Sequence, residues 1–94
     1  MLHKAITPDE NFFQKLMEYR VDIETGKVRN KKGKELGSYD SSGYVRVSIA
    51  GRMTLRSHIV WYKATGVWPT YQIRHYNKNI TDDRFPNLRA SNLW

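Results

Sequence analysis

Residues 44–49 constrain the fold more than any other segment of the chain. Apolar side chains occupy every second position, and polar or aromatic side chains stand between them. The apolar set is Val45, Val47 and Ile49, and the other set is Tyr44, Arg46 and Ser48. A period of two residues is that of a β-strand with one buried face and one face in water. We therefore expect a sheet with an apolar inner face and a polar outer face that carries Arg46.

Turn signals divide the surrounding region into short strands. Turn-forming residues gather at 24–27, 31–34, 41–43 and 50–52, and each group contains a glycine. Strands joined by such short connections pair in antiparallel fashion. The sequence thus predicts a small basic antiparallel sheet over residues 21–56.

Two helices are predicted around this sheet. In residues 1–20, Thr7 is the expected N-cap, with Pro8 at the first helical position and Glu10 completing a capping box. The apolar stripe of this helix is Phe12, Phe13, Leu16, Met17 and Tyr19. Together with the sheet, these helices define an α+β fold in one domain.

The second helix is expected over residues 58–65, within a segment 57–69 that also contains a Trp-Pro turn. Ser57 is its expected N-cap, and Gly66 is the expected residue at its C-terminal end. Val60, Trp61 and Ala64 form its predicted buried stripe, and Trp68 is expected to fold back onto the core. His58 lies outside that stripe, and the sequence leaves open a hydrogen-bonded structural role or a phosphate contact.

Charge and composition narrow the functional class. The 94 residues carry a net charge of +7 and contain no cysteine, which excludes disulfides and thiolate metal sites. No apolar run approaches the roughly 18 residues of a membrane span, and no secretory leader is evident.

Eight basic residues fall between positions 27 and 56 against two acidic ones, which leaves +6 of the total there. They are Lys27, Arg29, Lys31, Lys32, Lys34, Arg46, Arg52 and Arg56. Such a concentration favours nucleic acid as the partner.

The last quarter of the chain carries the most specific motif. Ile73-Arg74-His75-Tyr76-Asn77 is followed by Asp82-Asp83-Arg84 and then by Asn87-Leu88-Arg89. This run resembles the HNH motif of phage-type homing endonucleases, in which Ile-Asp-His-x-Asn precedes Asp-Asn-Arg and Asn-Leu-Arg. Residues 21–51 look like the sheet before that motif, and residues 56–69 are similar to the family's His-containing helix and Trp-Pro turn. Residues 70–94 then correspond to a truncated ββ hairpin of the HNH unit.

The resemblance implies roles for several residues. His75 would be the general base that activates water, and Asn87 would orient its imidazole. The family's acidic metal ligand would stand at position 74, where this chain has Arg74. A second ligand would come from a helix after the motif, and the sequence given ends before such a helix could form. The resemblance therefore implies a nuclease fold whose metal site is lost and which uses Mg²⁺ or Mn²⁺ only if cleavage survives.

Two alternatives concern the same positions. Asp82 and Asp83 are candidates for replacement metal ligands, although paired acids in a turn more often bind backbone amides or face water. Arg74 is either a plain phosphate anchor or a fixed cation that supports slow, metal-independent cleavage with His75 as base. Arg74 and Arg89 join the eight basic residues as expected nucleic-acid contacts.

Three functions follow from these residues. The first is a nucleic-acid-binding domain, with double-stranded DNA as the favoured ligand, that descends from a phage HNH endonuclease and is no longer catalytic. The second is a phage regulator or inhibitor that acts by binding a host protein through Tyr71, Tyr76 and Trp94. The third is an active metal-dependent nicking endonuclease. All three place the protein in the cytoplasm of an infected bacterium.

Overall fold

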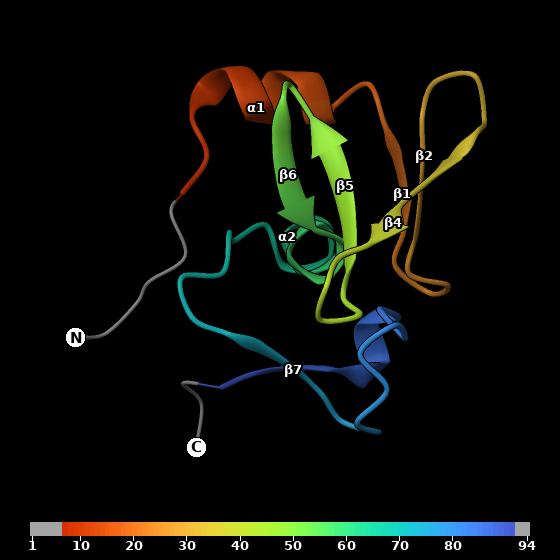
Figure 1. Ribbon diagram of the computed structural model, residues 1–94. Coiled ribbons are helices and arrows are strands. Elements are labelled where there is room, and N and C mark those ends of the chain that lie inside the picture. Colours follow the sequence, from red (N-terminus) through yellow and green to blue (C-terminus); the bar gives the residue numbers. More distant parts are fainter. Residues whose placement is uncertain (1–6, 92–94) are drawn as a thin grey trace.

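The computed structural model describes residues 7–91 and has an α+β fold (Figure 1). Its elements in chain order are α1 (Glu10–Leu16), β1 (Arg20–Asp22), β2 (Lys27–Arg29), β3 (Glu35–Leu36), β4 (Ser38–Tyr39), β5 (Val45–Ile49), β6 (Arg52–Leu55), α2 (Arg56–Thr65), β7 (Ile73–His75), the 3₁₀ turn η1 (Phe85–Asn87) and β8 (Leu88–Ala90). The strands form antiparallel sheets in the orders β1-β2-β3, β4-β5-β6 and β7-β8.

The predicted single sheet over 21–56 is in fact two three-stranded sheets. The division falls at Gly37, between β3 and β4, where φ is +142°. A Cβ atom at this position would lie 2.9 Å from Cγ1 of Val45. Only glycine fits such a backbone and such a close neighbour, so the chain can leave the first sheet and enter the second within one residue.

The alternation in residues 44–49 is confirmed. Val45, Val47 and Ile49 are buried in β5, whereas Arg46 is half-buried and Ser48 is exposed. β5 pairs with β6 through the predicted turn at Ala50 and Gly51, with Val47 opposite Thr54. The inner face of this hairpin therefore supplies part of the hydrophobic core.

The first helix begins later than predicted. Asp9, and not Thr7, is the N-cap, because its Oδ1 accepts a hydrogen bond of 3.0 Å from the backbone N–H of Phe12. Pro8 consequently precedes the cap instead of opening the helix. Phe12 and Leu16 are buried as predicted, but Met17 is 78% exposed because the helix ends at Leu16.

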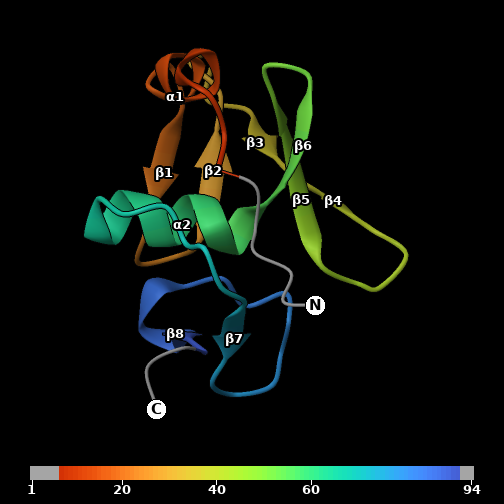
Figure 2. The same cartoon turned by 90° about the vertical axis from the view of Figure 1, so that its left-hand side faces the viewer.

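The second helix lies across the middle of the molecule. α1 and the two three-stranded sheets lie on one side of α2, and the β7–β8 hairpin lies on the other (Figure 2). The helix begins at Arg56 with Leu55 as N-cap, so the predicted cap Ser57 is instead a buried residue inside the first turn. Gly66 ends the helix in the left-handed conformation, as predicted, with φ of +79°.

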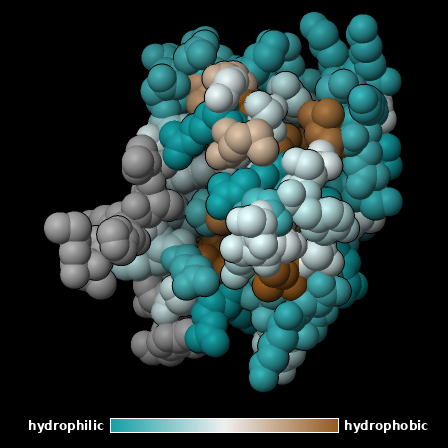
Figure 3. Space-filling view, viewed as in Figure 1, coloured by the Kyte–Doolittle hydropathy of each residue, from teal (hydrophilic) through white to brown (hydrophobic). Residues whose placement is uncertain are grey.

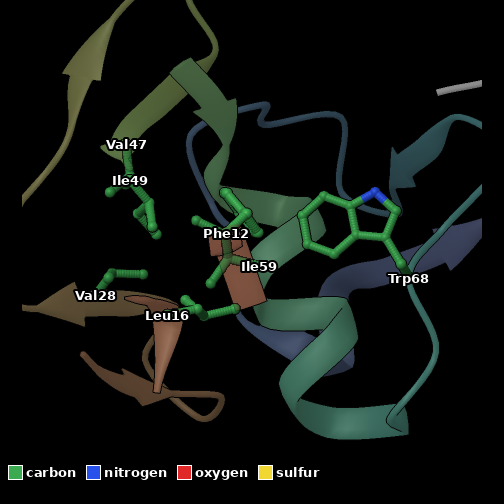
Figure 4. Close-up of a cluster of buried hydrophobic side chains, with 7 residues drawn as sticks. All are labelled: Phe12, Leu16, Val28, Val47, Ile49, Ile59 and Trp68. Atoms are coloured by element: carbon green, nitrogen blue, oxygen red, sulfur yellow. The ribbon is translucent and has the colours of Figure 1, made fainter. Parts of the chain in front are cut away.

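Each side of α2 has its own apolar cluster. The larger cluster surrounds Ile59 and contains Phe12, Leu16, Val28, Val47, Ile49 and Trp68 (Figure 4). The smaller one joins Val60 to Ile73 and Leu88 of the β7–β8 hairpin. The predicted stripe of α2 included Val60 but missed Ile59, because a helix covered on two sides does not show a single stripe.

Trp68 folds back onto the core as predicted. It is 7% exposed, and its ring lies 5.5 Å from that of Phe12 and 5.9 Å from that of His58 in edge-on contacts. His58 is itself 8% exposed. Burial of His58 lowers its pKa to about 4, and the nearby Arg46 and Arg52 add to this shift. These contacts favour the structural role of His58 over a phosphate contact.

Candidate functional site

His75 occupies the last position of β7, where pairing with Leu88 of β8 fixes its backbone. The side chain is 3% exposed, and its Nε2 lies 2.7 Å from Oδ1 of Asp83. An ionised carboxylate only accepts hydrogen bonds, so a ring paired with one donates from Nε2. In the neutral form of such a ring the lone pair is on Nδ1, which is the tautomer that a general base with an orienting carboxylate requires.

Asp83 also binds Arg56. Its Oδ2 accepts a hydrogen bond of 2.9 Å from Nε of Arg56, whose Nη2 donates to the carbonyl oxygen of Thr81, also at 2.9 Å. The Arg56 and Asp83 side chains are 12% and 2% exposed. Arg56, Asp83 and His75 thus form a buried ionic network that ties the start of α2 to β7. Removal of one partner from such a network typically destabilises a protein by about 3–5 kcal/mol.

Asn87 does not orient His75, contrary to the resemblance. Its Oδ1 accepts from the backbone N–H of Asn77, and its Nδ2 donates to Oδ1 of Asn77 and to the carbonyl oxygen of Asp82. These bonds, of 2.8–3.0 Å, hold the loop between β7 and η1 closed. The side chain that contacts the His75 ring is instead Asp83, at the position where the Asp-Asn-Arg motif of the resemblance has Asn.

Asp82 faces a different partner from Asp83. Its carboxylate binds Nε and Nη2 of Arg84, each at 2.7 Å, and accepts a bond of 2.9 Å from Nδ2 of Asn77. The hydrogen bond from Arg84 is the main reason that the pKa of Asp82 falls to about 2. A metal ion bound by these two acids would have to displace guanidinium groups from both. Among residues 7–91, no cluster of three or more acidic, histidine or cysteine side chains is placed to hold a metal.

The predicted nucleic-acid contacts fall into separate groups. Five of them project from β2 and from the turn that leads to β3, and we call this set the basic hairpin. Its members, Lys27, Arg29, Lys31, Lys32 and Lys34, are all exposed. Figure 3 shows hydrophilic side chains covering this corner of the molecule, at the upper right. Glu35 and Glu18 lie 3.9 and 3.8 Å from Lys27 and Lys31, and such exposed ion pairs contribute about 0–1 kcal/mol each.

The remaining basic residues lie elsewhere. Arg74 and Arg89 are exposed and stand directly opposite each other on β7 and β8. Arg46 is half-buried against Asp40 at 2.8 Å, and Arg52 lies over the ring of Phe12 at 5.8 Å. Arg56 is committed to the buried ionic network, which removes it from the contact surface expected from the sequence.

Sequence reasoning missed three residues in these regions. Arg20 of β1 stands opposite Arg29 of β2 and extends the charge of the basic hairpin. Arg84 holds Asp82, as described above. Lys78 has a φ of +67°, a backbone conformation that residues other than glycine rarely adopt. Only the cross-strand pairing of Arg20 could have been inferred from the predicted turn at 24–27.

Tyr76 is 74% exposed, and the guanidinium of Arg89 lies 5.0 Å from its ring centre. Tyr71 is 40% exposed. Trp94, the third aromatic anchor expected for a protein partner, lies outside the described residues. Exposed aromatic rings beside arginine can stack on bases as well as on protein side chains.

Comparison with protein-family models, curated proteins and solved structures finds no match to this chain. No helix within residues 7–91 has the length and apolar character needed to cross a bilayer. Because none of the three comparisons finds a match, the HNH resemblance depends on the motif residues alone.

Proposed function

We propose that this chain is a nucleic-acid-binding domain that grips the phosphate backbone through its basic hairpin. The observation that carries this proposal is the exposure of five cationic side chains on β2, the middle strand of a three-stranded sheet, and on the turn that leads to β3. Proteins that read DNA with a β-sheet place strands in a groove of the duplex, and lysines and arginines on such strands reach phosphates. The net charge of +7 adds a long-range attraction to the same ligand.

The proposed domain binds without efficient metal-dependent cleavage. The HNH resemblance assigns an acidic ligand to position 74, and this chain has an exposed arginine there. The nearby acids Asp82 and Asp83 are each held by an arginine. Mg²⁺ prefers carboxylate and phosphate oxygens, and a guanidinium repels it. The residues around His75 thus favour an anion over a divalent cation.

The salt dependence of DNA binding tests the role of the basic hairpin. Each phosphate contact on B-DNA contributes about 0.9 to the slope of log K against log salt concentration. We expect the double variant Lys32→Gln/Lys34→Gln to lower the magnitude of that slope by about 2. The measurement is fluorescence anisotropy with a labelled duplex over a range of KCl concentrations.

Lys63→Gln is the matched control, because Lys63 is an exposed lysine on α2 outside the basic hairpin. It should leave the slope unchanged. Equal effects of Lys32→Gln, Lys34→Gln and Lys63→Gln taken singly would show that only net charge matters. A slope near zero for the unmodified chain would contradict nucleic-acid binding altogether.

A second candidate function is phosphodiester hydrolysis, and the His75–Asp83 pair is the observation that favours it. A neutral ring that donates from Nε2 to Asp83 across this 2.7 Å contact would leave Nδ1 as the base. This function requires that charge on the leaving oxygen be stabilised by a metal ion or a fixed cation. A plasmid-cleavage assay with metal ions separates this function from binding alone.

A further inference from the structure

Two arginines stand next to each other on the outer face of the first sheet, where β1 and β2 run side by side (Figure 2). Arg20 of β1 is directly opposite Arg29 of β2. The neighbouring pair in the register is Val21 with Val28, of which Val28 is fully buried and Val21 is half-buried. Both arginines are exposed. Because side chains alternate between the two faces of a strand, the two arginines project together into water, away from the core.

No carboxylate of this sheet pairs with the two arginines. Among residues 7–91, no ion pair involves either guanidinium. Glu35 is the partner of Arg29 on β3, but its carboxylate lies 3.9 Å from Nζ of Lys27. The carboxylate of Asp22 accepts hydrogen bonds from two backbone N–H groups of its own turn. Directly opposite Cβ atoms on antiparallel strands lie about 4.5–5.5 Å apart, so the two like charges repel each other.

Two adjacent guanidinium groups suit a phosphate that carries two charges. Each guanidinium presents its N–H groups in a fork that can bind two phosphate oxygens at once. Nη1 of Arg29 donates to the carbonyl oxygen of Gly33 at 3.3 Å, and this neutral partner leaves the charge of Arg29 in place. A phosphodiester within a strand carries one negative charge. A terminal phosphate monoester carries about −1.5 to −2 charges near pH 7 and has three strong acceptor oxygens, so it can bind both arginines.

We propose that Arg20 and Arg29 together bind the terminal phosphate of a nucleic-acid strand. Arg29 is the last residue of β2 and precedes the turn that carries Lys32 and Lys34. A strand whose end is held by the two arginines can therefore continue along the turn of the basic hairpin. A bound dianion would also remove the repulsion between β1 and β2. This inference rests on the proposed function and adds to it a preference for the free ends of nucleic acid.

Fluorescence anisotropy of the whole chain with three short DNA duplexes tests the proposal. The duplexes share one sequence and one internal fluorophore, and their ends carry hydroxyl groups only, 5′-phosphates or 3′-phosphates. We expect one phosphorylated duplex to bind about tenfold more tightly than the hydroxyl-ended duplex, as for one additional hydrogen bond between charged groups. The duplex that binds more tightly identifies the end that the arginines recognise.

Arg20→Gln should abolish this preference, so that the three duplexes bind equally. It should also raise the midpoint of thermal unfolding, because it removes the repulsion between the strands. Arg20→Lys should retain only part of the preference, since an ammonium group lacks the guanidinium fork. The matched control is Lys32→Gln/Lys34→Gln, which should weaken binding to all three duplexes by the same factor and leave the preference intact.

Equal binding of the three duplexes by the unmodified chain would overturn this proposal and leave the basic hairpin as a contact for internal phosphates. A preference that survives in both Arg20→Gln and Arg29→Gln would also overturn it. If the chain binds none of the duplexes, the proposed function is wrong, and NMR titration with inorganic phosphate tests the arginine pair alone. Shifts of the Nε–H resonances of Arg20 and Arg29 would support the pair, and their absence would overturn it.

Discussion

At the scale of single residues, the position of Asp83 depends on a glycine from a distant turn. Gly26, in the turn between β1 and β2, has a φ of +76°. A Cβ there would lie 2.6 Å from the backbone carbonyl carbon of Asp83. The N–H of Phe85 also donates to the carbonyl oxygen of Ile23 at 2.8 Å. The turn that the sequence predicted at 24–27 therefore also packs against the backbone of the candidate site and fixes the position of Asp83.

Gly26→Ala should destabilise the protein by about 3 kcal/mol, since it combines a left-handed alanine with overlap against backbone that cannot move aside. Gly33→Ala is the control, because Gly33 has a similar φ of +86° but no atom within 4 Å of its Cβ position. The control should lose only about 1 kcal/mol. Urea denaturation monitored by tryptophan fluorescence measures both. Equal losses would show that Gly26 acts only through its own conformation.

His58 should make stability depend on pH in the acid range. Its pKa is about 4 in the folded chain and 6.5 in the unfolded one, because burial and then Arg46 and Arg52 disfavour the charged ring, while Asp83 opposes them. Above pH 6.5 both states are neutral, and below it only the unfolded chain gains the proton. The folded state should lose about 2 kcal/mol between pH 7 and pH 5 from this residue.

The variant His58→Gln should lack this part of the pH dependence, because it cannot titrate. Urea denaturation of both chains at pH 7 and pH 5 gives the difference due to His58. Parallel losses in the two chains would contradict the assignment. Asp82 does not affect this comparison. Its pKa is lowered to about 2, so the stability that it contributes is lost only as the pH falls below the ordinary pKa of aspartate.

At the scale of secondary-structure elements, sequence patterns predicted correctly those features that depend only on neighbouring residues in the chain. The alternation of β5, the glycine turns and the left-handed Gly66 each follow from backbone geometry within a few residues. The cap at Asp9 was missed because Thr7, Pro8 and Glu10 offered an equally good local pattern. The break at Gly37 was missed because it depends on contact with Val45, a residue of another strand.

In the candidate site too, the contacts between residues far apart in the sequence were not predicted. His75 was identified from its motif, but its partner was assigned to Asn87 by resemblance. The structure assigns it to Asp83, because the side-chain amide of Asn87 already binds Asn77 and Asp82. Arg56 looked like a phosphate contact in a basic segment. Its burial against Asp83 joins positions 27 residues apart, which no spacing rule reveals.

At the scale of the whole molecule, α2 joins two halves that carry different candidate sites. The half that contains α1 and both three-stranded sheets carries the basic hairpin and the larger apolar cluster. The other half, the β7–β8 hairpin, carries His75, Arg74 and Arg89. Arg56 at the start of α2 and Val60 within it connect the second half to the first. The proposed binding by the basic hairpin and the proposed chemistry at His75 can thus be tested separately by mutation.

We propose that the chain binds nucleic acid and does not cleave it efficiently with metal ions. The most direct measurement incubates supercoiled plasmid with the unmodified chain in Mg²⁺ and in Mn²⁺, and runs a gel shift on the same DNA. Arg74→Asp, which restores a carboxylate before His75, and His75→Ala are assayed in parallel. We predict a gel shift without nicking by the unmodified chain. Metal-dependent nicking by the unmodified chain that His75→Ala abolishes would contradict the account and would make Asp82 and Asp83 the ligands to test.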